Sequence, residues 1–449
     1  MLKQQKIFFD FLHFCIGSAK EIPSSLKEAD WKEIYAIAKK QCLVGVLFDG
    51  IKKLPAEHVG MEKELLLQWM AESQMLEKAN VRLNDAAILV SEWFRKKGFR
   101  TCILKGQGNA LLYPNPYSRT PGDIDIWVEG GDKRVISFVR SISPHEKACY
   151  HHIEFPSYKG VEVEVHYRPS FLLYFWHNRK LQKYYERVKE DQFSHRVMLG
   201  EQGEIAIPTV EFNLIFQLTH ILSHLMNEGI GLRQLLDYYY VLCDCYKVYQ
   251  KSSKITPSLF TLKEGSTSHP DPLTLRGEGG NHPTRCSEPL RSKDGGPSKI
   301  SPNCAGWDRR DAIGDMTSAT ASTSTDTSAT AARSSSTAID RVQEELKELG
   351  LWKFAGGIMY IMKEVFGMPA FLLIVPPNEK YGKFVLNEVL EAGNFGRHDA
   401  RNRFGRSQLG HNLQRVYRDI RLVRYFPGEA LCEPLFRIWH FFWRMKNKK

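Results

Sequence analysis

The stretch LKGQGNALLYPNPYSRTPGDIDIWVEG, residues 104–130, decides the fold of this chain. Within it, residues 122–129 alternate polar and apolar side chains, as a half-buried strand does. Asp123 and Asp125 are two residues apart, so both carboxylates project from one face while the intervening isoleucines point into a core. Two carboxylates this close repel each other unless a cation lies between them. A hard divalent ion such as Mg²⁺ would resolve this repulsion, although for the pair taken alone an exposed strand face with two solvated acids is the commoner arrangement.

A second alternating stretch, GVEVEVHYR at residues 160–168, repeats this pattern. Glu162, Glu164 and His166 share one face of the expected strand, and three valines share the other. If this strand lies beside residues 122–129, a third carboxylate joins the two aspartates.

Lys105, Gly106, Gln107 and Gly108 form a turn between an apolar strand and a helical segment. Glycines at such a turn let backbone N–H groups approach phosphate oxygens, and a helix start adds partial positive charge. Most glycines of this kind only make turns, so the motif alone is weak. Arg119, four residues before the first aspartate, adds a fixed positive fork for a phosphate.

Pattern and composition divide the chain into five segments. Residues 1–84, 171–250 and 341–449 carry apolar residues at helical spacing, whereas residues 85–170 mix strands and helices. Residues 251–340 lose this periodicity and are rich in Gly, Pro, Ser and Thr, which cannot bury enough apolar surface to offset ordering. We predict an α+β chain in which a small mixed sheet lies between helical regions, with a disordered insertion.

Overall composition is that of a soluble globular protein. The 449 residues are 43% hydrophobic and 25% charged, which excludes a collagen-like or wholly disordered chain. No run of apolar residues is long enough for a membrane-spanning helix. The nine cysteines form no CxxC pair, which excludes a disulfide framework and a zinc site of that type and favours a reducing, cytoplasmic setting.

Positive charge is concentrated near the C-terminus. The net charge is +11, and residues 401–449 hold twelve Lys or Arg against three acidic residues. An anionic partner is one interpretation of this basic region. Residues 435–449 are aromatic on one side, which fits a helix packed on the core, a membrane-surface contact or a nucleic-acid contact, core packing being the commonest. The arginines at near-helical spacing are Arg401, Arg403, Arg406, Arg415, Arg418, Arg421 and Arg424.

These motifs together resemble a known group of proteins. A glycine turn, an Asp-hydrophobic-Asp strand and a later carboxylate on another strand are similar to the nucleotidyltransferase superfamily with the DNA polymerase β-like fold. More narrowly, the chain resembles the bacterial family of uncharacterised nucleotidyltransferases, over residues 85–250 and not over 251–340. The matching elements are LKG, Tyr113, Arg119, GDIDIWV, VEVHYR and the helical residues His220, His224, Leu232, Arg233 and Asp237.

The resemblance implies roles for individual residues. Asp123 and Asp125 would bind the catalytic metal ions, Mg²⁺ or else Mn²⁺. Glu164 would orient or deprotonate the attacking group, because the family pattern places an acid two residues before the His of His-aromatic-Arg; Glu162 is the fallback. The superfamily usually has Gly-Ser or Gly-Gly in the turn, where this chain has KGQG. Either a hydroxyl or Lys105 with backbone amides would then contact the triphosphate.

Other residues are candidates for the pocket. His220 and His224 are four apart on a helix, a spacing that can chelate metal, but no third ligand is obvious, so a structural or substrate-lining role is favoured. Arg233 and Asp237 either pair along their helix or reach the pocket. The YHH of residues 150–152 is expected on a surface hairpin, with a base or acceptor pocket as the alternative. His166 and Arg168 complete the candidate set.

The implied reaction transfers a nucleoside monophosphate from an NTP to an acceptor hydroxyl and releases pyrophosphate. The acceptor stays open among a sugar, a small metabolite, an RNA end and a protein side chain. A catalytically silent nucleotide-binding regulatory module and a toxin-like RNA-modifying nucleotidyltransferase are the alternatives. Loss of an essential carboxylate would indicate the silent module, and all three carboxylates are present.

Overall fold

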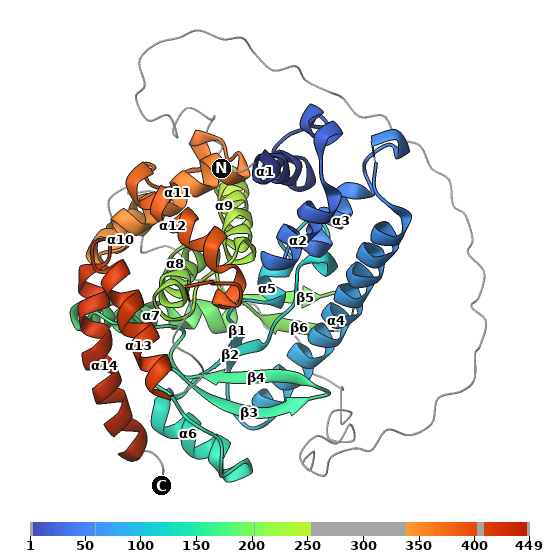
Figure 1. The fold of residues 1–449 in the computed structure, drawn as a ribbon. Helices are drawn as coiled ribbons and strands as arrows, with labels where there is room; N and C mark the ends of the chain where they lie inside the picture. The colour runs from blue at the N-terminus through green and yellow to red at the C-terminus, as the bar shows by residue number, and fades with distance from the viewer. Residues whose placement is uncertain (1–2, 59, 202, 253–337, 402–407, 447–449) are drawn as a thin grey trace.

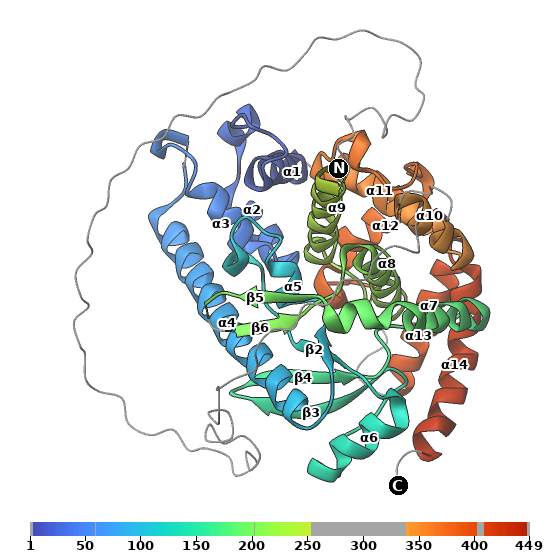
Figure 2. The same ribbon diagram turned by 180° about the vertical axis from the view of Figure 1, so that it is seen from behind.

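The computed structural model describes residues 3–58, 60–201, 203–252, 338–401 and 408–446 (Figures 1 and 2). Helices predominate in these residues and surround a small mixed sheet near the middle of the chain. The predicted α+β class is therefore confirmed. Most of the insertion predicted at 251–340 lies outside the described residues.

The central sheet has four strands in the order β1-β2-β4-β3. β2 and β4 run parallel, whereas β1 with β2 and β3 with β4 are antiparallel. The two alternating stretches of the sequence thus lie side by side at the centre of the sheet. The strands are β1 (Thr101–Ile103), β2 (Ile124–Val128), β3 (His152–Tyr158) and β4 (Val161–His166), and a separate hairpin joins β5 (Arg196–Leu199) to β6 (Gly203–Ala206).

One face of the sheet packs against α4 (Lys63–Lys96) and α6 (Gly131–Ile142). Ile124 and Ile126 are buried on this face, as predicted from the alternation. α4 runs through the domain boundary predicted at residue 84, so the N-terminal helical region and the sheet share one long helix. It ends before Gly98, whose φ of +79° is a conformation that glycine adopts without strain.

The opposite face of the sheet packs against α7 (Phe175–Ser194) and α8 (Val210–Asn227). Trp127 anchors this layer, with its ring centroid 4.7 Å from that of Phe193 and 5.9 Å from that of Phe212. Because side chains alternate along β2, Asp125 shares this face with Trp127. The predicted carboxylates therefore lie between the sheet and its helical cover.

Helices from both ends of the chain complete the molecule (Figure 1). His13 and the carbonyl of Val365 hydrogen-bond at 2.9 Å, which ties the N-terminal helices to the C-terminal ones. The remaining helices are α1 (Lys3–Ile16), α2 (Trp31–Lys40), α3 (Val44–Ile51), α5 (Gln107–Ala110), α9 (Leu232–Ser252), α10 (Ala338–Glu348), α11 (Trp352–Phe366), α12 (Glu379–Ala392), α13 (Gln408–Leu422) and α14 (Pro427–Lys446).

α14 buries only part of its apolar surface. Phe436 packs inward against Tyr150 and Phe171, at centroid distances of 5.6 and 5.1 Å. Trp439 and Phe442 are 47% and 62% exposed, so the core packing expected for the C-terminal aromatic residues is wrong for these two. Within the described part of the chain, every helix is too short or too polar to cross a membrane.

Candidate active site

A cavity of about 480 Å³ opens on the face of the sheet that carries the predicted carboxylates. Asp123, directly before β2, Asp125 on β2 and Glu164 on β4 all line it. Each offers a carboxylate oxygen, and these oxygens lie within 4.8 Å of one another. The parallel register explains the convergence, because it pairs Asp125 directly with Glu164.

Glu162, the fallback for the third carboxylate, has a different place. The pairing of β2 with β4 begins at Ile124 and Val163, so Glu162 lies just outside the paired segment. Its side chain is exposed, and it is not one of the described residues that line the cavity. Glu164 is the glutamate that the structure brings to the aspartates.

Lys105 supplies a cation to this cluster. Its Nζ lies 3.1 Å from Asp125 Oδ2 and 2.8 Å from His220 Nε2. Burial would lower the pKa of Lys105, but the charges of Asp125 and Asp123 outweigh burial and raise it. Burial and the nearby ammonium hold the pKa of His220 well below its usual value, so His220 is neutral and accepts a hydrogen bond from Lys105.

The three carboxylates differ in how their charge is compensated. Burial would raise the pKa of Asp125, but Lys105 and His166 outweigh burial and hold it well below its usual value. Burial also opposes ionisation of Glu164, yet the hydrogen bond from His166 lowers its pKa. Asp123 is the reverse case, since the charge of Asp125 and then burial raise its pKa. A further cation beside Asp123 would relieve this repulsion.

The donor atoms of this cluster fit a hard divalent ion. Asp125 Oδ2 is buried and has no aligned hydrogen-bond donor in the described part of the chain, although the ammonium of Lys105 is nearby. A buried carboxylate oxygen that keeps a lone pair, beside two further carboxylates, is the oxygen donor set that Mg²⁺ takes. Asp123, Asp125 and Glu164 therefore fit such an ion.

Histidines line the same cavity on several sides. His166 Nε2 lies 3.0 Å from Asp125 Oδ1 and 3.4 Å from Glu164 Oε2. Burial opposes its protonation, but hydrogen bonds to the two carboxylates raise the pKa of His166 to about 9. The structure also brings the YHH segment, expected on a surface hairpin, into the cavity wall. The histidines that line the cavity are His151, His152, His166, His220, His224 and His440.

Arg119 is not brought to the cavity. Its guanidinium makes a bidentate ion pair with Asp237, with both N–O distances 2.8 Å, and it is 2% exposed. Tyr113 donates a further hydrogen bond of 2.7 Å to Asp237. Asp237 thus pairs with Arg119 and not, as one expectation had it, with Arg233 along the helix. Arg233 donates to the carbonyl of Thr120 instead. These contacts fix the loop before β2 onto α9.

Within the glycine turn, only Lys105 lines the cavity among the described residues. Gln107 Nε2 donates to Asn84 of α4, and a Cβ on Gly108 would lie 3.0 Å from Ile207. Both residues therefore pack against neighbouring elements and do not face the cavity. Gly106 has a φ of +61°, which turns the chain at Lys105.

Arg168 also acts behind the cavity wall. It donates to the carbonyl of Tyr150 at 2.7 Å and pairs with Asp132 at 2.9 Å. It therefore holds the YHH segment in place and is not one of the described lining residues.

The C-terminal helices supply a wall that the motifs did not indicate. It consists of residues from the segment before α13 and from α13 and α14: Phe395, Arg415, Glu433, Phe436, Arg437 and His440. No local pattern distinguishes these residues, because their role depends on contacts with strands more than 200 residues earlier.

The basic region of the sequence is divided by the structure. Arg401 and Arg421 form ion pairs with Glu388, and Arg401 also pairs with Asp399. Arg418 is buried, whereas Arg415 lines the cavity. Arg403 and Arg406 lie outside the described residues.

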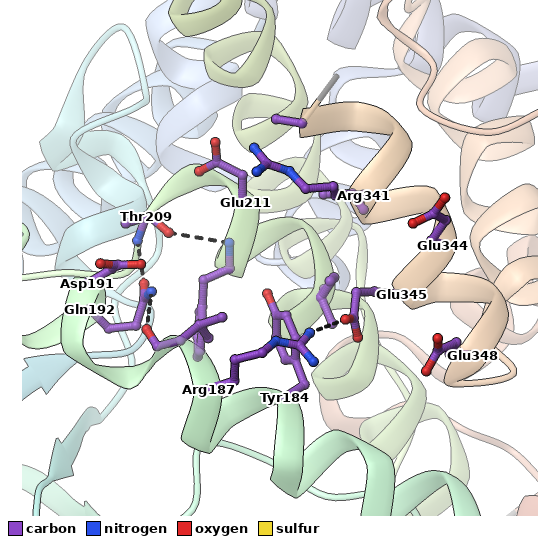
Figure 3. Close-up of a pocket in the computed structure, with 15 residues that line it drawn as sticks. Tyr184, Arg187, Asp191, Gln192, Thr209, Glu211, Arg341, Glu344, Glu345 and Glu348 are labelled. Atoms are coloured by element: carbon purple, nitrogen blue, oxygen red, sulfur yellow. Dashed lines mark hydrogen bonds and ion pairs between the residues drawn. The ribbon is translucent and has the colours of Figure 1, made fainter. Parts of the chain in front are cut away.

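A larger cavity of about 580 Å³ lies elsewhere, between α7, α8 and α10 (Figure 3). An ion pair between Arg187 and Glu345 spans it. None of the predicted site residues is among the described residues that line it. Size alone therefore does not identify the candidate site, and the smaller cavity holds the convergent carboxylates.

Residues 27–246 match a family model described as uncharacterised nucleotidyltransferase. The match covers just under half of the chain, includes every predicted site residue and ends before the C-terminal wall. It supports a general nucleotidyltransferase function.

Solved structures and curated proteins add little. The crystal structure of an antigenic nucleotidyltransferase-like protein from Paracoccidioides brasiliensis is similar at 15% identity and a TM-score of 0.24, over 36% of this chain and 75% of that one. A TM-score this low does not support a shared fold or a shared function. No curated protein matches the chain.

Proposed function

We propose that this chain is a metal-dependent nucleotidyltransferase that moves a nucleoside monophosphate from an NTP to an acceptor hydroxyl and releases pyrophosphate. The observation that carries the proposal is the convergence of Asp123, Asp125 and Glu164 in one cavity, from strands about forty residues apart. The family match to residues 27–246 supports the same class of reaction.

Asp123, Asp125 and Glu164 would hold the divalent ion, Mg²⁺ or Mn²⁺. When bound, such an ion neutralises charge on the triphosphate and favours ionisation of an attacking hydroxyl. Glu164 lines the same cavity and is half-buried, so it is placed to orient the acceptor hydroxyl and accept its proton.

Lys105 is the residue we assign to the triphosphate. Its ammonium carries three N–H donors and is held at the carboxylates by Asp125. A phosphate oxygen beside these carboxylates would lie within reach of the ammonium, which favours Lys105 over a hydroxyl as the contact. Arg119, predicted to bind phosphate, would act as a positioning residue, because its pair with Asp237 fixes the loop that leads to Asp123.

The acceptor would bind toward the C-terminal wall. Arg415 and Arg437 place positive charge there, and Phe171 and Phe436 stack with centroids 5.1 Å apart beside it. A planar group can pack on such rings, and a cation selects a negatively charged group. An acceptor that carries both, such as an RNA end or an anionic metabolite, fits this wall better than a neutral sugar.

The direct test is isothermal titration calorimetry of each NTP, with and without Mg²⁺. We expect Mg²⁺-dependent binding to the wild type and its loss in the Asp123→Asn, Asp125→Asn double variant. Glu162→Gln is the matched control, because it removes an acid from the same strand outside the cavity. Failure of every NTP to bind the folded wild type, with Mg²⁺ present, would contradict the proposal.

A further inference from the structure

We propose that His152, Glu164 and His166 form a second metal position beside the aspartates, one that takes a borderline divalent ion such as Zn²⁺. It goes beyond the proposed function, because two histidines take the place of the aspartates beside the shared Glu164 and the ion is a different one. The Mg²⁺ cluster is made of oxygen donors alone, whereas this position has two imidazoles and one carboxylate.

The three donor atoms already have the spacing of ligands around one ion. Glu164 Oε2 lies 3.2 Å from His152 Nδ1 and 3.4 Å from His166 Nε2, and all three atoms lie within 4.8 Å of one another. Two ligands at about 2.0–2.1 Å from a tetrahedral zinc ion stand about 3.3 Å apart. Asp125 Oδ1, 3.0 Å from His166 Nε2, is the nearest further oxygen.

The strands hold these donors in place. His152 on β3 pairs directly with His166 on β4, and Glu164 precedes His166 by two residues on the same face. All three therefore belong to the regular part of the sheet and not to a loop. A site built on paired strands requires little ordering when the ion binds.

A backbone carbonyl orients the histidine that lies deepest. His166 Nδ1 is 3.3 Å from the carbonyl oxygen of Arg168, so the proton on Nδ1 is donated there and Nε2 faces the carboxylates. An ion at this position would displace the proton that Nε2 otherwise donates to Asp125 and Glu164. Metal-binding histidines usually have such a partner on their second ring nitrogen. Arg168 is itself fixed by Asp132, which holds this carbonyl in position.

The donor chemistry selects the ion. Imidazole nitrogens suit zinc and other late transition metals, whereas Mg²⁺ takes oxygen ligands. Two histidines with one glutamate, and a position left open, are also a ligand set of catalytic zinc. The three donors line the same cavity as Asp123 and Lys105.

A neighbouring set of donors competes for the same ion. Cys149, His151 and His152 also have donor atoms within 4.8 Å of one another. That set lacks a carboxylate, and two of its three members precede β3. We therefore assign the ion to His152, Glu164 and His166. Binding by the set that contains Cys149 is an outcome that the test distinguishes.

The test uses full-length, metal-free protein and Zn²⁺ alone, without nucleotide. Calorimetry should show a Zn²⁺ site in the wild type that persists in Asp123→Asn. Loss of even an outer-shell partner typically costs roughly ten- to a hundredfold in metal affinity, so His152→Ala should weaken binding at least tenfold. His440→Ala, a histidine of the same cavity outside the set, is the control and should bind as the wild type does.

Co²⁺ as a probe distinguishes the ligand sets. Visible absorption without a thiolate charge-transfer band is expected, and Cys149→Ser should leave it unchanged. A thiolate band that disappears in Cys149→Ser would overturn the assignment, as would unweakened binding in His152→Ala or loss of binding in Asp123→Asn. His152 is partly exposed and its variant should fold, so the test does not depend on the buried His166. Since no nucleotide is present, its outcome is separate from that of the NTP titration.

Discussion

Asp125 on β2 lies directly opposite Glu164 on β4, in the parallel strand pair at the centre of the four-stranded sheet. His166 bridges the two carboxylates, and Lys105 contacts Asp125 from the other side. Two cations, a buried anion and the half-buried Glu164 thus stabilise one another, and the removal of any member leaves a partner with less compensation.

We expect Asp125→Asn to lower the free energy of unfolding as well as to abolish activity. Removing one partner of a buried ion pair typically costs about 3–5 kcal/mol, because the other charge stays buried without compensation. Chemical denaturation of metal-free protein measures this loss. In Lys105→Met, Asp125→Asn, both charges are gone, so the double variant should be less destabilised than the sum of the single variants. Strict additivity would show that the two groups do not interact.

The pH dependence of stability should report on His166. Its pKa in the folded protein is raised to about 9, above the usual 6.5 of an unfolded chain. The stabilisation is therefore fully present below about pH 6.5 and is lost as the pH rises through about 9. The shift corresponds to roughly 3 kcal/mol for this buried group.

This prediction is checked by denaturation of the wild type and His166→Gln across that pH range, with chelator present. The difference between the two proteins should shrink as the pH rises. A difference that is constant from pH 6 to 10 would mean that His166 is neutral in the folded protein.

The pair of Arg119 and Asp237 should matter for folding more than for nucleotide contact. Both side chains are buried, and Asp237→Asn is expected to cost about 3–5 kcal/mol of stability. Tyr113→Phe removes one hydrogen bond to the same carboxylate and should cost about 1–3 kcal/mol. Folded Tyr113→Phe keeps the pair of Arg119 with Asp237 and should bind NTP as the wild type does, which calorimetry below the unfolding transition measures. Weakened NTP binding by folded Tyr113→Phe would instead indicate that Tyr113 and Asp237 contribute to the nucleotide site.

The sequence was sufficient for the carboxylates because their signal is local. A period of two places Asp123 with Asp125, and Glu164 with His166, on single strand faces, and two such strands with apolar opposite faces pair in a sheet core. Strand β3 was missed because Pro156 interrupts its pattern, and proline in a strand argues for an edge. The YHH segment, expected on a surface hairpin, leads into this strand and lines the cavity instead.

Arg119 shows why the remaining site residues could not be predicted. Its distance of four residues from Asp123 says nothing of the burial that pairs it with Asp237, 118 residues later. The residues of the C-terminal wall lie still further from the strands along the sequence. Most of them belong to helices whose spacing of apolar residues indicates only that one helix face packs on the core. Only the tertiary arrangement reveals that Arg415 and Phe436 face the same cavity as Asp125.

The cavity has a cation at each end, Lys105 beside the carboxylates and Arg415 on the C-terminal wall, and the orientation of the bound nucleotide decides which one contacts the triphosphate. If the triphosphate lies at Lys105, Lys105→Met should weaken NTP binding by roughly tenfold or more, since hydrogen bonds to charged groups contribute about 1.5–3 kcal/mol. Arg415→Met removes an exposed cation at the opposite wall and should change NTP affinity by less than about fivefold, a limit set by the small contribution of exposed charges, about 0–1 kcal/mol. Calorimetry with Mg²⁺ present measures both. The reverse result would place the triphosphate at the C-terminal helices and the acceptor hydroxyl beside Lys105, which would exchange the two binding regions while leaving the carboxylates at the reaction centre.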